Sequence, residues 1–122
     1  MLKSLSFATL ATIAFAATAF AAEPAPSAKN GMFVDAKGMT LYIFDNDAGG
    51  KPSCYDDCAK KWPPYLGKAE DKMTEGWTLV ERKDKTLQWA YDKKPVYFFV
   101  SDKKKGDMTG EGMGGVWHTI ME

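Results

Sequence analysis

The residues with the most distinctive chemistry are Cys54 and Cys58, the only cysteines of this 122-residue chain. In a chain with an export signal, described below, two cysteines pair by default as a disulfide. Their i, i+4 spacing on a helix would place the Cα atoms about 6 Å apart, within disulfide range. The closed loop is very short, so we expect a small stabilisation, near the low end of about 0–5 kcal/mol. The favoured interpretation is a structural clip, and the alternative is a redox-active or metal-binding dithiol.

Soft metal ligands gather toward the C-terminus, where the chain carries Met108, Met113, His118 and Met121. Together with the two cysteines, these side chains form a donor set that suits copper in an oxidising compartment. Methionine is also an ordinary filler of small β cores, and a regular strand would place His118 and Met121 on opposite faces. We therefore expect no cofactor, with copper as the alternative.

The motif Tyr-x-Phe-x-x-Asp occurs twice, as Tyr42, Phe44 and Asp47, and again as Tyr97, Phe99 and Asp102. Trp62 and Trp117 follow the two tyrosines at the same distance, so four identities share an offset of 55 residues. A repeat with a fixed offset indicates two related units. We expect the rings in the core and the aspartates bonded to backbone N–H groups in turns. The alternative is an aromatic surface that contacts carbohydrate or peptide.

Catalytic signatures do not occur in the sequence. The chain has one histidine and no Gly-x-Ser-x-Gly, His-Glu-x-x-His or phosphate-loop pattern. The acidic side chains form no distinctive pair and are typical of a solvated surface. We therefore name no catalytic residue and expect that the protein is not an enzyme.

Short apolar runs separated by turn residues predict a mainly β, antiparallel domain built from the two repeats. Residues 32–44 are expected to form a hairpin, residues 77–100 a three-stranded meander, and residues 116–121 a closing strand. In the strand that ends the hairpin, both faces are apolar, so we expect cover on both sides. One short helix is predicted at about 53–62, with Ser53 as N-cap and a stop at the following prolines.

The first 21 residues have the features of a secretory signal peptide: Lys3, an apolar run, and the Ala19-Phe20-Ala21 cleavage pattern. Residues 22–30 read as a flexible linker and residues 31–122 as one domain. No cysteine lies at the cleavage site, so we expect no lipid anchor and, after cleavage, no membrane span. The predicted location is the periplasm or the exterior.

Charge argues against electrostatic binding of nucleic acid or of an anionic membrane, because the formal net charge is zero. The one basic run, Lys103 to Lys105, is flanked by Asp102 and Asp107. A solvated turn is the favoured interpretation of this run.

The string Ser53-Cys54-x-x-x-Cys58-Ala59-x-x-Trp62-Pro63-Pro64, preceded by the first tyrosine motif, resembles one repeat of a known bacterial family. These small exported proteins are named for a Yx(F/W/Y)xxD motif and described as a secreted repeat of unknown function. Residues 88–117 resemble the family's other repeat. The resemblance implies export and a repeated domain but no established activity. Many relatives are predicted lipoproteins, and this chain differs because it lacks the lipobox cysteine.

These observations favour an exported, non-catalytic module that binds an unknown ligand or an envelope protein. The alternative is a periplasmic copper-binding or thiol redox protein that uses the Cys-x-x-x-Cys pair.

Overall fold

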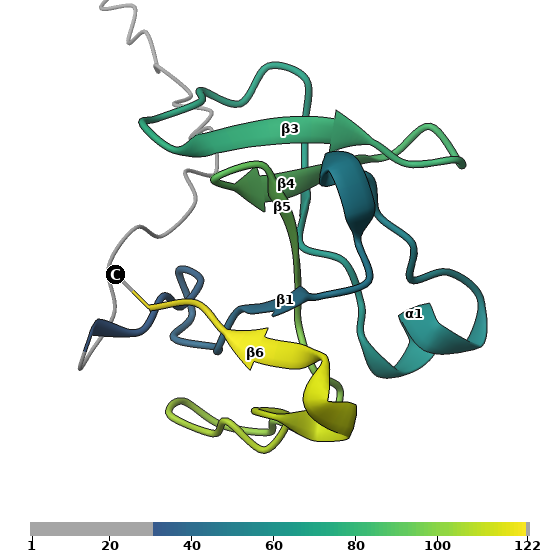
Figure 1. The fold of residues 1–122 in the computed structure, drawn as a ribbon. Helices are drawn as coiled ribbons and strands as arrows, with labels where there is room; N and C mark the ends of the chain where they lie inside the picture. Colours follow the sequence, from purple (N-terminus) through teal and green to yellow (C-terminus); the bar gives the residue numbers. More distant parts are fainter. Residues whose placement is uncertain (1–30, 122) are drawn as a thin grey trace, which may run out of the picture.

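The computed structural model describes residues 31–121. The strands in this range form one antiparallel sheet (Figure 1). The predicted signal peptide and linker lie outside the described residues. The strands are β1 (Tyr42–Phe44), β2 (Leu66–Gly67), β3 (Trp77–Glu81), β4 (Leu87–Tyr91), β5 (Lys94–Tyr97) and β6 (Trp117–Thr119). Their order is β2-β4-β5-β1-β6, and β3 pairs with β4. The mainly β, antiparallel prediction is confirmed.

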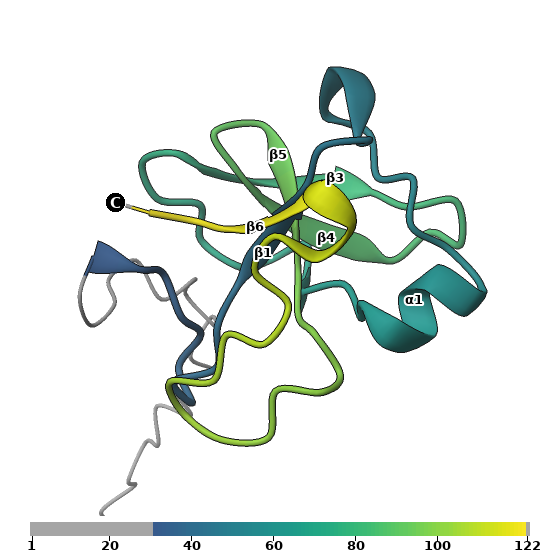
Figure 2. The ribbon, with the colours of Figure 1, turned by 60° about the horizontal axis from the view of Figure 1, so that its bottom comes forward.

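The predicted meander is present as β3, β4 and β5, which pair in sequence order. The predicted hairpin at 32–44 is also present, in a short form: Val34 pairs with Thr40 across a turn in which Asp35 accepts N–H bonds from Lys37 and Met39. Figure 2 shows β6 lying along β1, its antiparallel neighbour.

The helix is shorter than predicted. Helix α1 spans Asp57–Lys61 rather than residues 53–62, and Asp56 precedes it with a φ of 53°. Ser53 does not cap the helix, because it lies three residues before the N-cap position, which Asp56 occupies, and its amide and hydroxyl donate to Asp47 instead. The capping prediction was wrong for this reason. The stop is as expected, since Trp62 ends the helix just before the two prolines.

The two repeats are related in structure by an approximate two-fold axis between β1 and β5. Tyr42 faces Tyr97 across these strands. Pro64 pairs with Tyr97, and Thr119, which lies 55 residues after Pro64, pairs with Tyr42. The sequence offset therefore extends into the backbone pairing.

The same offset relates the segments that lead into the two tryptophans. Val100 donates its N–H to the Lys61 carbonyl at 2.9 Å, and Asp45 donates to the Val116 carbonyl at 2.8 Å. The first acceptor ends α1, and the second follows the short 3-10 helix η3 (Met113–Gly115). Helix η3 is thus the counterpart of α1, although it has no disulfide.

The last strand of each repeat pairs with strands of the other repeat. The segment 63–67 follows α1 in the first repeat, yet it bonds to β4 and β5 of the second. In turn β6 belongs to the second repeat and pairs with β1, and Met121 pairs with Met32 of the first. The two repeats are interlocked within one sheet.

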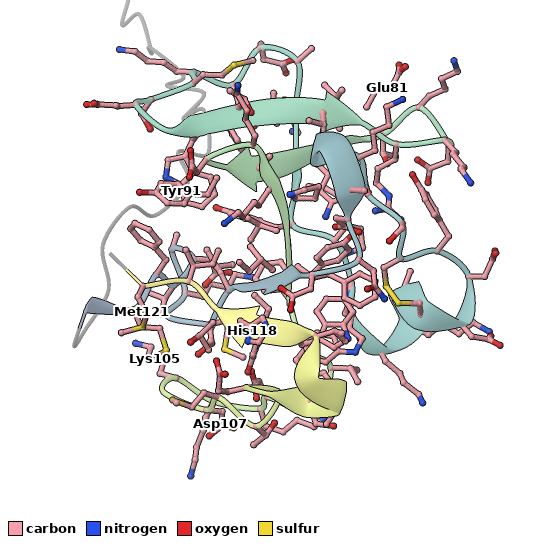
Figure 3. The ribbon with its side chains drawn as sticks, viewed as in Figure 1. Glu81, Tyr91, Lys105, Asp107, His118 and Met121 are labelled. Atoms are coloured by element: carbon pink, nitrogen blue, oxygen red, sulfur yellow. A yellow bond between two sulfur atoms is a disulfide. The ribbon has the colours of Figure 1, made fainter. Side chains whose placement is uncertain are left out.

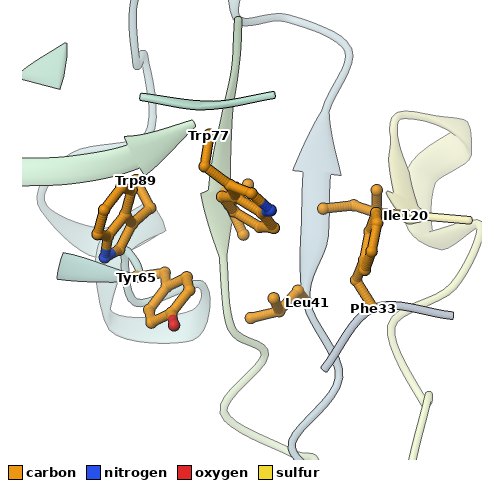
Figure 4. Packing of buried hydrophobic residues seen from close by; sticks show 7 residues of the cluster. Phe33, Leu41, Tyr65, Trp77, Trp89 and Ile120 are labelled. Atoms are coloured by element: carbon orange, nitrogen blue, oxygen red, sulfur yellow. The ribbon is translucent and has the colours of Figure 1, made fainter. Parts of the chain in front are cut away.

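The buried side chains form two clusters. The first, drawn in Figure 4, contains Phe33, Leu41, Tyr65, Trp77, Trp89, Val96 and Ile120. The second contains Tyr42, Cys54, Trp62, Tyr97, Phe99 and Trp117. Adjacent residues of the strand 41–44 alternate between the clusters, so the strand is covered on both faces, as predicted.

Candidate functional site

The two tyrosine motifs are joined by an exchange of hydrogen bonds. Tyr42 donates its hydroxyl hydrogen to Asp102 at 2.6 Å, and Tyr97 donates to Asp47 at 2.8 Å. Each bond therefore links the tyrosine of one repeat to the aspartate of the other. Both tyrosines are fully buried. Burial is the main cause that raises the pKa of each hydroxyl well above its usual value.

The aspartates also hold the loops that follow them. Asp47 accepts bonds from the amide and hydroxyl of Ser53, and Asp102 accepts the same two bonds from Thr109. This matches the expectation that these carboxylates accept backbone N–H groups. Burial raises the pKa of Asp47, and the bonds from Ser53 and Tyr97 oppose that rise. The polar groups of both motifs are thus used within the fold.

Four aromatic rings form a continuous stack across the two-fold axis, in the order Phe44, Trp117, Trp62, Phe99. Their successive centroids lie 4.0, 3.8 and 4.2 Å apart. Trp62 and Trp117 are only 4% and 5% exposed. The indole faces are occupied by one another, so this arrangement gives no support to an aromatic surface for carbohydrate or peptide.

Cys54 and Cys58 are joined by a disulfide. Cys54 precedes α1 and is fully buried in the second cluster, whereas Cys58 lies within the helix and is half-buried. The bond therefore ties the loop before the helix to the helix itself. In this oxidised form the pair offers no thiolate to a metal.

His118 lies apart from the cysteines and carries two acidic neighbours. Its Nε2 is 2.8 Å from Asp45, and its Nδ1 is 3.7 Å from Glu111. The hydrogen bond with Asp45 is the main cause that raises the pKa of His118. Within residues 31–121, no group of three or more His, Cys, Asp or Glu side chains could hold a metal ion.

Two of the predicted methionines meet at a cavity of about 380 Å³. Its lining residues are Met32, Val34, Gly38, Lys105, Gly106, Met108, Thr119 and Met121. Both repeats contribute to it, and Lys105 and Met121 lie side by side there (Figure 3). Met113, in η3, does not line this cavity. Met32 and Lys105 were missed from the sequence, because Met32 has no motif around it and Lys105 was interpreted as part of a solvated turn.

The comparison with protein families gives two matches in this chain. The model of a secreted repeat of unknown function matches residues 27–65 and again residues 78–121. The chain belongs to this family. No curated protein and no solved structure matches it. In residues 31–121, none of the helices has the length and apolar character needed to cross a membrane.

In this secreted-repeat protein, the region of the other half that corresponds to the cavity contains different side chains. The pairing of Met32 with Met121 corresponds to that of Gln88 with Leu66, so Gln88 is the counterpart of Met32. Beside Gln88 lies the buried side chain of Arg82, which donates to the Gln88 side-chain oxygen at 2.6 Å and to the Cys54 carbonyl at 2.9 Å. The two secreted repeats thus differ at this position, and Arg82 also lines a separate hollow with Gly50 and Lys51, the residues 55 positions before Lys105 and Gly106.

Proposed function

We propose that this protein is an exported, non-catalytic binding module and that its ligand site is the cavity lined by Met32, Met108 and Met121. The observation that carries the proposal is the cavity itself, an apolar hollow of about 380 Å³ built by both repeats. Pockets for small molecules have this size and are mostly apolar with few polar groups. The secreted family supports export, and the ligand is our inference.

The exposure of the lining methionines supports the proposal. Met108 and Met121 are 47% and 60% exposed, although burial of each thioether side chain would stabilise the protein. Methionine side chains are flexible and adapt to ligands of irregular shape. The motif residues Tyr42, Tyr97, Trp62 and Trp117, in contrast, already satisfy one another inside the fold.

Methionine methyl NMR tests this function. We would label the methionine methyl groups with ¹³C and titrate the mature protein with 1-decanol, a neutral apolar probe. The expected result is saturable shifts of the Met32, Met108 and Met121 signals. Met73 and Met113 serve as controls, because both are exposed outside the cavity. Shifts of all exposed methionines alike, or no shift, would contradict the proposal.

A second candidate is binding of Cu(I) at the same cavity. It is favoured by one observation, the three thioethers of Met32, Met108 and Met121 around one hollow, because soft sulfur ligands select Cu(I). Competition with a chromophoric Cu(I) chelator would show one retained equivalent, lost in Met108→Leu and kept when both cysteines are replaced by alanine. Copper retention that instead depends on Cys58 would assign the copper site to the cysteine pair and contradict a site made of methionines.

A further inference from the structure

We propose that the ligand is a single-chain amphiphile whose anionic head is bound by Lys105 and whose apolar tail lies among the methionines. This inference rests on the proposed function and specifies the ligand of the same cavity. Three observations support it: the position of Lys105 in the cavity wall, the lack of acidic side chains among the described lining residues, and the apolar character of the rest of the lining.

Lys105 lines the cavity, and two contacts fix its position. Its side chain packs against Gly38, and its turn is bonded to Thr40. A Cβ at Gly38 would lie 2.8 Å from Lys105 Cγ, so the side chain rests in a space that only glycine leaves open. Thr40 donates its hydroxyl hydrogen to the Asp107 carbonyl at 2.6 Å and so fixes this turn to the start of β1. The Lys105 side chain therefore lies along the wall of the cavity beside Gly38.

The positive charge of Lys105 is not neutralised by any acidic side chain of residues 31–121. Lys105 forms no ion pair within the part of the chain that the structure describes, residues 31–121. The nearest acid in the sequence, Asp107, accepts the backbone N–H groups of Lys103 and Lys104. Among the described residues that line the cavity none is acidic, so an anionic head would complement Lys105.

The lining of the cavity is mostly apolar and suits an alkyl chain. Thr119 and Met121 also line an adjoining hollow of mixed character, with Ile43, Tyr91, Asp92, Lys94 and Ile120. An alkyl chain placed among the methionines would bury apolar surface, which favours binding.

The test compares probes that share one tail and differ in the head. Decanoate and decyltrimethylammonium would be titrated separately below micelle formation, with ¹³C methyl NMR and calorimetry as readouts. We expect decanoate to bind about tenfold more tightly than the cation, the range for one charge-assisted bond. The substitution Lys105→Glu should reverse this preference, whereas Lys104→Glu, from the same basic run but outside the cavity, should not.

The outcomes separate the two proposals. Equal binding of decanol, decanoate and the cation, unchanged by Lys105→Glu, would leave the binding function intact and overturn the anionic head. Loss of decanoate binding in Lys94→Glu alone would also overturn the assignment to Lys105. If none of the three probes shifts the cavity methionines, both proposals fail. Retained preference in Lys104→Glu with reversal in Lys105→Glu supports the inference, and the unfolding midpoints of both variants check that they are folded.

Discussion

The indole rings of Trp62 and Trp117 lie parallel, with their centroids 3.8 Å apart. Each ring is contributed by a different repeat, and each also meets the tyrosine of its own motif edge-on, at 5.1 Å for Tyr42 and 5.2 Å for Tyr97. The stack is thus the point where the packing of both repeats meets, so its neighbours should tolerate little added volume.

Gly110 is the neighbour with the least room. A Cβ at this position would lie 2.5 Å from the Trp62 ring and 3.0 Å from Phe99. We expect Gly110→Ala to destabilise the protein by about 1–3 kcal/mol through overpacking, measured by urea unfolding. Because the close atoms belong to the six-membered ring of the indole, Trp62→Phe should reduce the added cost of Gly110→Ala. Equal costs in both backgrounds would show that the clash is not the cause.

The buried hydroxyl of Tyr42 donates to Asp102 and accepts the Gly110 N–H at 3.1 Å. Removal of this group in Tyr42→Phe leaves both partners buried without it, and we expect a loss of about 1–3 kcal/mol of unfolding free energy. The matched control is Tyr55→Phe, since the Tyr55 hydroxyl accepts only an exposed N–H of Lys83, and its change should stay within about 0.5 kcal/mol. Similar small effects of both variants would refute a structural role for the exchanged bonds.

Asp47 should make stability depend on pH in one direction. Burial raises the pKa of Asp47 above the ordinary 3.8, so Asp47 binds a proton more readily in the folded than in the unfolded protein. The resulting stabilisation is present below the ordinary pKa and is lost as pH rises through the folded pKa. Relative to Asp47→Asn, the wild type should therefore gain stability as pH falls from neutral. The comparison cancels the opposite contributions of Asp84, Asp107 and Glu111, whose pKa values are lowered. A constant difference across the pH range would contradict this.

His118, the single histidine, gives one NMR titration curve. We expect a pKa above the ordinary 6.5, because the charged imidazolium is stabilised by Asp45 and Glu111. Any stability this provides is present below 6.5 and is lost as pH rises through the folded pKa. Asp45→Asn should lower the pKa more than Glu111→Gln, since Asp45 is at 2.8 Å and Glu111 at 3.7 Å. The reverse order would show that the solution geometry differs.

The disulfide closes a loop with a sequence separation of only four residues. The chain-entropy model then gives about 2 kcal/mol of stabilisation. We expect the double substitution Cys54→Ala with Cys58→Ala to lower the unfolding free energy by about this amount and to leave the fold intact. Reductant should lower wild-type stability similarly and leave the variant unchanged. A double variant that fails to fold would show that the bond is essential rather than a local clip.

The two repeats and the mainly β fold could be predicted because they depend on patterns close in sequence. From Leu41 to Phe44, aliphatic and aromatic residues alternate, as in a strand with two covered faces. The four motif identities share one offset. The start of the helix could not be predicted in this way. Ser53 has the side chain of an N-cap, but it donates to Asp47, six residues earlier, and the helix begins only after Asp56. Only the folded loop brings Ser53 and Asp47 together.

The cavity could not be predicted from the sequence, for a different reason. Its walls come from separate segments around Met32, Gly38, Lys105 and Met121, none of which carries a motif. The hollow also lies between the two repeats, since Met32 and Val34 come from the first and Met108 and Met121 from the second. Local patterns do not report a space between segments that are distant in the sequence.

The interlocked strands also determine when the chain can fold. Neither repeat can complete its sheet from its own residues, because β1 requires β6 and β5 requires the segment around Pro64. A nascent chain that lacks its last few residues can still pair β1 with β5 and β5 with β4, but one edge of β1 stays without its neighbour. The pairing of the first repeat is therefore completed by residues at the far end of the chain, so this half of the sheet closes only after nearly all of the sequence has been made.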